Sequence, residues 1–331
     1  MTAISQSLLR DLPQLRPLNV VRDLPAVADL VEMCFTETLD SDGHRFIQQM
    51  RNAANDNKFL GWAVRFVESS SLPLTGYVWE ESDSLVGNIS VIPFRKNGEK
   101  IYLIANVAVH PDHRLRNIAT NLTEVAIEHA RQRKAAEIWL QVRHDNSPAI
   151  NMYQRFGFQE IARRTRWLAV PANQIPLNSD DLTIRERKSG QWSIHKKWLG
   201  RLYPDELNWY QPLEWYLFHP GLIPFIMRFF TESEMQHWII TNRYGIQAVV
   251  SRSAEFNRLQ RIWVAIPERY DPNALTSLLI HIRGSVAGAH KQVLDFPFGQ
   301  AQDSIQNAGF SAARTLIWMK MDTTSAFNFR K

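Results

Sequence analysis

The sequence predicts two α/β domains in tandem, and three observations support this fold class. The length of 331 residues suits about two domains. Strand and helix patterns alternate along the first half, and the second half repeats their order. With 45% apolar and 21% charged residues, the composition is that of a globular protein and excludes a disordered chain.

The first half opens with a short strand at 15–20, followed by two helices. Apolar residues recur at helical spacing over 24–35, and 43–57 is a second, more polar helix. Polar turns then separate runs that are rich in strand-forming residues. These runs predict strands at 76–79, 85–94 and 101–109.

The remainder of this half alternates helix and strand. One stripe of the predicted helix 117–134 is apolar and contains Ile118, Leu122, Val125, Ala126 and Ala130. A buried strand is expected at 138–142. A helix then starts with Ser147 as N-cap and Pro148 in its first turn and ends at Gly157, before the last strand, 161–170.

The segment 171–181 is polar, contains two prolines and is the expected domain linker. We therefore expect an N-terminal extension at 1–14, a first domain at 15–170 and a second at 182–331. The expected strands of the second domain are 182–187, 236–242, 245–252, 259–266, 292–296 and a last one ending at Met319; its helices are 190–202 and 273–287. Gly309-Phe310 repeats Gly157-Phe158, which indicates a duplicated unit, although a chance Gly-Phe after a helix would look the same.

Charge and cysteine content exclude several classes of protein. The formal charge of +5 suits an anionic cofactor and is too small and too dispersed for a nucleic-acid partner. Cys34 is the single cysteine, so there is no internal disulfide and no cysteine-based zinc site, and we expect no metal. Cys34 lies on an apolar helical stripe and is interpreted as a buried structural thiol. No signal peptide or membrane span is predicted, which favours the cytoplasm.

The stretch 107–119 combines a strand, a proline turn and a loop that opens a helix. Backbone N–H groups at a helix start are unpaired and attract anions such as a pyrophosphate. Asn117 tolerates left-handed geometry, Ala119 is small, and Arg114 and Arg116 add positive charge. The same pattern also fits ordinary α/β architecture with no ligand.

A second stretch begins at Asn146 and continues through a short helix to Tyr153 and Gly157-Phe158. The phenol of Tyr153 is able to donate a proton to a thiolate leaving group. A packing role is the alternative.

Together, these stretches resemble the GNAT superfamily of acetyl-CoA-dependent N-acyltransferases over roughly residues 15 to 170. The family's phosphate loop, Gln/Arg-x-x-Gly-x-Gly/Ala, corresponds to Arg114-x-x-Asn117-x-Ala119, with Asn in place of the first Gly. Asn146, Tyr153, Gly157 and Phe158 match the later motif in order and spacing. The resemblance implies an α/β (α+β) fold in which each domain is a mixed, mostly antiparallel sheet flanked by helices.

The resemblance also implies roles for individual residues. Tyr153 would protonate the thiolate of CoA after an amine attacks acetyl-CoA directly, without an acyl-enzyme. The residues that would bind acetyl-CoA are Val107, Ala108 and Val109 along the pantetheine arm, Arg114, Leu115, Arg116, Asn117, Ile118, Ala119 and Thr120 around the pyrophosphate, and Asn146 near the pantetheine.

The general base is not identified by the sequence. Positions that face the amine in relatives fall near Leu103 and Ala105, which carry no base. Glu37, His44 and Glu80 are candidates acting through water, whereas His110 and His113 are expected to be structural or solvent-facing.

The second half resembles a GNAT domain that has lost its chemistry. Its corresponding loop contains Pro272, which has no N–H, and Ile305 stands at the tyrosine position. We therefore expect an N-acetyltransferase acting on an unidentified primary amine, with a homodimer left open. The rival hypothesis is a non-catalytic acyl-CoA sensor. The aromatic segment 207–230 is either a buried helix pair between the domains, an acceptor or apolar-ligand pocket, or a membrane-surface element.

Overall fold

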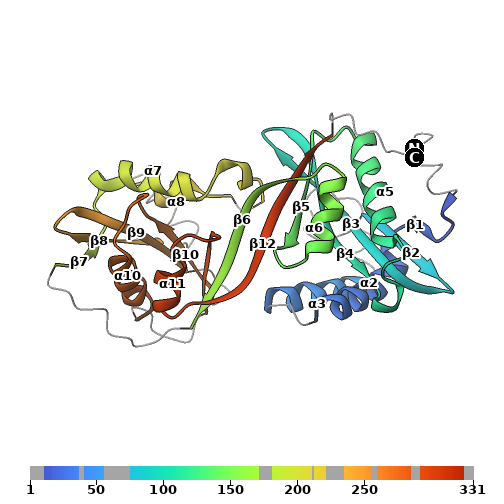
Figure 1. Ribbon diagram of the computed structural model, residues 1–331, viewed down its shortest axis with the longest axis horizontal. Coiled ribbons are helices and arrows are strands. Elements are labelled where there is room, and N and C mark those ends of the chain that lie inside the picture. Colours follow the sequence, from blue (N-terminus) through green and yellow to red (C-terminus); the bar gives the residue numbers. More distant parts are fainter. Residues whose placement is uncertain are drawn as a thin grey trace. The chain divides into compact units, whose positions relative to one another are not determined.

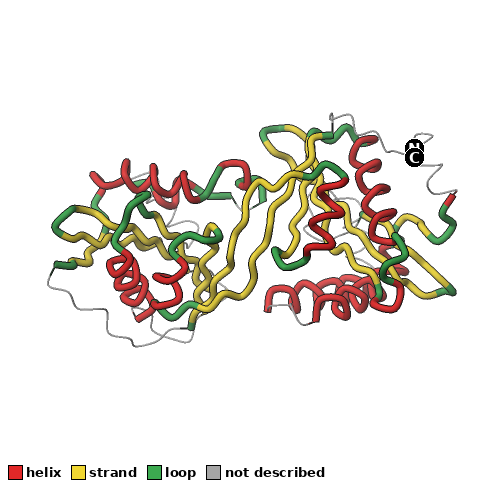
Figure 2. Tube along the Cα trace, viewed as in Figure 1, coloured by secondary structure: helices red, strands yellow, loops and turns green. Residues whose placement is uncertain are grey.

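The computed structural model describes residues 11–36, 41–55, 75–170, 181–210, 212–220, 235–254, 259–284 and 291–323. Helices and strands alternate along both halves of the chain, as the sequence predicts (Figure 1, Figure 2). The chain forms two compact units, which divide after Ala162 and after Leu316.

Both divisions fall inside strands. Strand β6 (Gln159–Ala169) contributes its first residues to unit 1 and the remainder to unit 2. Strand β12 (Ser311–Asp322) contributes its last residues to unit 1 and its first residues to unit 2. The linker expected from the sequence lies after β6, and its residues 171–180 are outside the described part of the chain.

The sheet of unit 1 has the strand order β1-β2-β3-β4-β5-β12-β6. Strands β4 and β5 pair in parallel, whereas β1-β2, β2-β3 and β3-β4 pair antiparallel, so the sheet is mixed and mostly antiparallel. The remaining strands of the unit are β1 (Leu15–Pro17), β2 (Gly76–Glu81), β3 (Ser84–Lys96), β4 (Glu99–Val109) and β5 (Glu137–Arg143).

Helices cover both faces of this sheet because side chains alternate between the faces along each strand. Its helices are α2 (Val20–Phe35), α3 (Ser41–Asn55), α5 (Ile118–Gln132) and α6 (Ser147–Arg155). Helices α5 and α6 pack with one set of strand residues, which includes Ile317, Met319 and Met321 of β12. Helices α2 and α3 pack with the other set, which includes Val78 and Ala108. β1 is shorter than predicted because the side chain of Asn19 caps the start of α2 at Val20.

Unit 2 has the strand order β12-β6-β11-β10-β9-β8-β7. Its further strands are β7 (Thr183–Glu186), β8 (Met235–Asn242), β9 (Gly245–Ala254), β10 (Leu259–Ala265) and β11 (Lys291–Pro297). Its helices are α7 (Trp192–Leu202), α8 (Trp215–Phe218), α10 (Pro272–Gly284) and α11 (Gln302–Asn307). Strands β10 and β11 pair in parallel, as β4 and β5 do in unit 1, and α10 and α7 lie on opposite faces.

The expected repeat extends to the hydrogen bonds at the Gly-Phe pairs. Gly157 and Gly309 both have positive φ, +90° and +80°, which glycine adopts without a steric penalty. The N–H of Phe158 donates to the carbonyl of Tyr153 at 3.1 Å, and the N–H of Phe310 donates to Ile305 at 3.2 Å. The two helices therefore end in the same way at corresponding positions.

The described part of the aromatic segment, 207–210 and 212–220, is part of the core of unit 2. Leu207, Leu213 and Phe218 are buried, and the last two pack beside α7 with Ile239 and Val249. These described residues are thus buried within unit 2, and α8 is a short helix rather than one of a pair. Residues 211 and 221–230 lie outside the described part of the chain.

Candidate functional site

Strands β4 and β5 separate partway along unit 1. Their parallel pairing ends at Ile104 and Leu140, although β4 continues for five residues. Beyond this point β4 pairs with β3 alone. Backbone N–H and C=O groups on its other edge are then available to an extended ligand, in the manner of a missing strand.

A β-bulge lies at the point of separation. The register of β3 and β4 shifts between Asn88 and Ser90, so that Asn106 and Val107 both lie opposite Ile89. Asn106 has a φ of +51°, and its carbonyl accepts a hydrogen bond of 2.8 Å from the amide of buried Asn88. The extra residue at the bulge changes the faces of the sheet to which the following side chains of β4 point. Val107 and Val109 consequently contact the α5 cluster, and Ala108 contacts the α2 cluster.

The loop after β4 ends at a helix start that no side chain caps. Asn117, the N-cap of α5, has a φ of +59° and makes no side-chain capping bond. The first free N–H groups of the helix belong to Ile118, Ala119 and Thr120, since the N–H of Asn121 is the first to bond back, to Asn117. Asn is among the few residues that tolerate this conformation, so the replacement of the family's glycine is compatible with the loop.

The two arginines of the loop differ in their surroundings. Arg114 is exposed, and its Nε donates to the carbonyl of Val109 at 3.4 Å. Arg116 instead forms two hydrogen bonds of 3.0 Å to Glu81 at the end of β2. Leu115, between them, has a φ of +62° and a fully exposed side chain. Arg114 is thus the freer of the two charges.

The later motif positions Tyr153 inside the unit. Asn146, and not Ser147 as predicted, is the N-cap of α6, because its Oδ1 accepts from the N–H of Ala149 at 3.2 Å. Tyr153 is 5% exposed, and its ring lies edge-on to Phe158 with 5.9 Å between centroids. Burial raises the pKa of Tyr153, so the phenol keeps its proton at neutral pH. Its hydroxyl makes no hydrogen bond to another described residue, which leaves it available as a donor.

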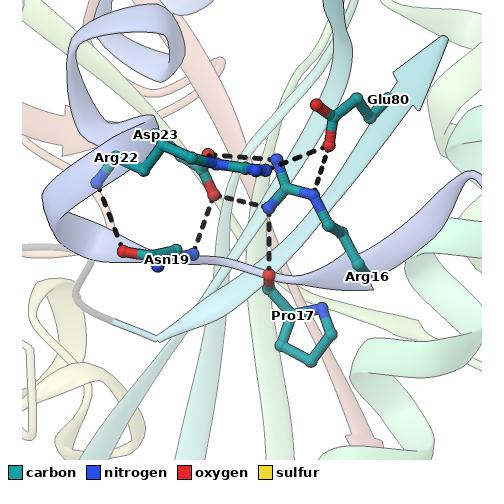
Figure 3. Close-up of polar contacts among 6 residues, drawn as sticks. All are labelled: Arg16, Pro17, Asn19, Arg22, Asp23 and Glu80. Atoms are coloured by element: carbon teal, nitrogen blue, oxygen red, sulfur yellow. Dashed lines mark hydrogen bonds and ion pairs between the residues drawn. The ribbon is translucent and has the colours of Figure 1, made fainter. Parts of the chain in front are cut away.

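Of the three proposed bases, the structure describes two. Glu80 lies in a cluster of charges with Arg16, Arg22 and Asp23 (Figure 3). Hydrogen bonding from Arg16, with further help from Arg22, lowers the pKa of Glu80, which makes its carboxylate a weak base. His44 is exposed, with its Nδ1 3.9 Å from Glu32.

Glu37 lies outside the described residues. Leu103 is buried and Ala105 is half-buried, and neither side chain carries a basic group.

The charged cluster around Glu80 also explains why Asp23 can be buried. Burial would raise the pKa of Asp23, but hydrogen bonds from Arg16 and Arg22 outweigh it and lower the pKa.

The histidines and the cysteine near the loop make structural contacts. The Nδ1 of His110 accepts from the N–H of Asp112 at 3.3 Å, and the Nδ1 of His113 lies 3.1 Å from Glu81. Cys34 is half-buried rather than buried as expected, and its Sγ donates to the carbonyl of Val109 at 3.3 Å. Burial raises the pKa of Cys34 despite the neighbouring Arg114, so the group is a thiol rather than a nucleophilic thiolate at neutral pH.

The corresponding helix start in unit 2 is capped from within the chain. The Oδ1 of Asp271 accepts from the N–H groups of Asn273 and Ala274 at 2.9 and 3.3 Å. A carboxylate therefore lies where α10 would otherwise attract an anion. Pro272, the first residue of the helix, offers no N–H. Ile305, at the position of Tyr153, is fully buried.

The strands of unit 2 also separate, but a side-chain hydroxyl bonds to the backbone of β10 beyond that point. Parallel pairing of β10 and β11 ends at Ile262 and Leu294. Tyr203 contacts the clusters on both faces of the sheet, and its hydroxyl accepts from the N–H of Val264 at 3.2 Å. Tyr203 thus occupies the opening at this edge of β10. The β9-β10 register, moreover, is continuous from Gln260 to Ala265, without a bulge.

Two features are absent from the described residues. No group of three or more His, Cys, Asp or Glu side chains is arranged there to hold a metal ion. None of the helices in these ranges is long and apolar enough to cross a membrane.

Comparison with known proteins finds similarity to one family. Residues 35–158 match the Acetyltransferase (GNAT) family. An N-acetyltransferase structure from Sphaerobacter thermophilus superposes with a TM-score of 0.55 at 14% identity, covering 96% of this chain and 98% of that one. The fold is therefore that of GNAT proteins. The match over residues 35–158 lies in the first half of the chain, where the motifs that resemble the family are found.

The similar sequences are distant and partial. The [ribosomal protein bS18]-alanine N-acetyltransferase of Escherichia coli K12 is 36% identical over 62 residues, 19% of this chain and 42% of that protein. An N-alpha-acetyltransferase of Sulfurisphaera tokodaii is 30% identical over 101 residues, 30% of this chain and 58% of that protein. The chain thus spans roughly half the length of these relatives, which supports acyl transfer as a reaction class and leaves the substrate open.

Proposed function

We propose that unit 1 transfers the acetyl group of acetyl-CoA to a primary amine by direct attack. The observation that carries this proposal is the contrast between the units. Unit 1 has an open strand edge next to an uncapped helix start. In unit 2, Tyr203 and Asp271 occupy the equivalent places.

The open edge of β4 would bind the amide groups of the pantetheine arm along Val107, Ala108 and Val109. The N–H groups of Ile118, Ala119 and Thr120 would bind the pyrophosphate, with Arg114 adding charge. Asn146 would present its amide N–H₂ to the pantetheine region, because its Oδ1 is already used as the cap of α6.

In the reaction, the amine nitrogen forms a bond to the acetyl carbon and the carbon–sulfur bond breaks. Tyr153 donates its proton to the departing thiolate and regains one from solvent. The attacking nitrogen loses its proton to water, because the carboxylate of Glu80, whose pKa is lowered by Arg16 and Arg22, is a weak base. No covalent acyl-enzyme is formed, and Cys34 takes no part.

The acceptor we propose to test first is an α-amino group. Two relatives are named for acetylating alanine of a ribosomal protein and N-alpha positions. A third, at 42% identity over 55 residues, is a streptothricin acetyltransferase, which makes small amino compounds the second class to test.

The experiment is CoA release from acetyl-CoA with a panel of N-terminal peptides and small amines. Amine-dependent release supports the enzyme. The alternative function, an acyl-CoA sensor, is favoured by the weak basicity of Glu80. Tight acetyl-CoA binding without release across the panel would support the sensor instead.

A further inference from the structure

One carboxylate on β2 holds the loop that precedes α5. Oε1 of Glu81 accepts from the indole of Trp79 at 2.9 Å and from Arg116 at 3.0 Å. Oε2 accepts a second bond from Arg116 at 3.0 Å and lies 3.1 Å from Nδ1 of His113. Two loop residues thus converge on a side chain that lies 35 positions before Arg116. Bidentate pairing of this kind fixes geometry as well as charge.

The contacts of Glu81 with Arg116 and His113, called the clamp below, act where few other interactions stabilise the loop conformation. Leu115 and Asn117, on either side of Arg116, both have left-handed φ values, +62° and +59°. Asn117 tolerates left-handed backbone, but this conformation is unfavourable for a residue such as Leu115 and persists where the surroundings enforce it. The fully exposed side chain of Leu115 makes no packing contact that could do so.

Backbone hydrogen bonds do not supply the missing support either. The last backbone hydrogen bond of the turn runs from the N–H of Arg114 to the carbonyl of Pro111, at 3.3 Å. Among the described residues, no backbone bond is donated by Leu115, Arg116 or Asn117. The side chain of Arg116 is therefore the main tie between these three residues and the sheet.

We propose that Glu81 is a positioning residue for the phosphate loop: through Arg116 and His113 it holds residues 115–117 in the conformation that presents the start of α5 to the pyrophosphate of CoA. The inference rests on the proposed function of unit 1. It assigns Arg116 an indirect role, different from the direct phosphate contact that the motif implies.

Whether CoA binding weakens or strengthens when the charge of Glu81 is removed distinguishes a positioning role from simple charge repulsion. A carboxylate near a polyanion opposes binding, so its neutralisation alone should leave CoA affinity equal or improved. If Glu81 positions the loop, its neutralisation should weaken binding, because the competent loop conformation becomes one of several and the apparent Kd rises by the inverse of its population.

The first experiment is calorimetric titration of the full chain with CoA, comparing Glu81→Gln with Glu80→Gln. The control removes the same charge from the adjacent residue, whose partners are Arg16 and Arg22 rather than the loop. We expect the Kd for CoA to rise about 10-fold in Glu81→Gln, corresponding to a loop populated about one tenth of the time, and to change less than 2-fold in Glu80→Gln. Equal or tighter binding by Glu81→Gln overturns the proposal.

A second variant keeps the test independent of how Glu81→Gln folds. Arg116→Lys retains a positive charge near the phosphates but cannot form the bidentate pair. We expect it to lose affinity by a factor similar to that for Glu81→Gln, and the double variant to be no weaker than either single one. Retained affinity in Arg116→Lys, or additive losses in the double variant, would show that Arg116 binds phosphate directly.

Steady-state kinetics separates positioning from a general loss of structure. Because the loop acts on the phosphates, KM for acetyl-CoA should rise in Glu81→Gln while kcat at saturation stays within about 2-fold. A fall in kcat with unchanged KM contradicts the inference. If the wild-type chain itself binds no CoA, the proposed function of unit 1 fails, and this inference fails with it for that separate reason.

Discussion

Replacing Tyr153 with Phe tests the chemistry proposed for unit 1 with the smallest structural change. The ring keeps its place in a site that is 5% exposed and its edge-on contact with Phe158. The hydroxyl has no hydrogen-bond partner among the described residues, so its removal leaves no orphaned donor or acceptor there. We therefore expect the melting temperature and CoA affinity to change little.

The rate of acetyl transfer should nevertheless fall. A general acid contributes about 10²- to 10⁴-fold. The thiol of CoA has a pKa near the roughly 8.5 of cysteine, so the thiolate can leave without help and the loss should lie near 10². Because burial raises the pKa of Tyr153, the phenol stays protonated and the rate attributable to it should be independent of pH between about 6 and 9.

The appropriate assay is a single turnover of acetyl-CoA with excess enzyme and amine. Slow product release would hide a chemical defect in steady-state rates. Phe158→Leu is the matched control, since it alters packing against the same ring and removes no donor. An unchanged single-turnover rate in Tyr153→Phe refutes the general-acid role and leaves Tyr153 as a packing residue.

Four further predictions concern other parts of the molecule. Titration with CoA should give one site per chain, because Asp271 and Tyr203 occupy the equivalent places in unit 2; two equivalent sites would contradict this. Arg114→Ala should raise the Kd for CoA about 10- to 150-fold, the loss of one charge-assisted contact of roughly 1.5–3 kcal/mol, and an unchanged Kd would show that Arg114 faces solvent alone. Met319→Ala should destabilise unit 1 by about 2–5 kcal/mol in urea denaturation, since this residue of β12 is fully buried beside α5, whereas the exposed Ser311→Ala should have almost no effect. Burial lowers the pKa of His129 to about 4, whereas a histidine in the unfolded chain titrates near 6.5. Because the unfolded chain therefore binds a proton first as pH falls, the free energy of unfolding should be highest above pH 6.5 and decline toward pH 4. His129→Asn should reduce this pH dependence.

Local signals in the sequence determined the order of the helices and strands. Helix starts such as Asn146-Ser147-Pro148 and the stops at Gly157 and Gly309 act within a few residues, so their effect on the backbone can be predicted without knowing the fold. The loss of function expected for unit 2 also followed from single residues. Pro272 cannot donate an N–H, and Ile305 cannot transfer a proton, in any tertiary setting.

The tertiary structure decided which distant residues meet. The bulge at Asn106, the clamp from Glu81 to Arg116 and the Tyr203 hydroxyl on Val264 join residues 18, 35 and 61 positions apart. Their contacts depend on strand register, and a period-2 pattern fixes which face a side chain occupies but not which strand lies beside it. For the same reason, the alternation of elements predicts β12 as a last strand and does not reveal that its final residues complete the core of the first unit.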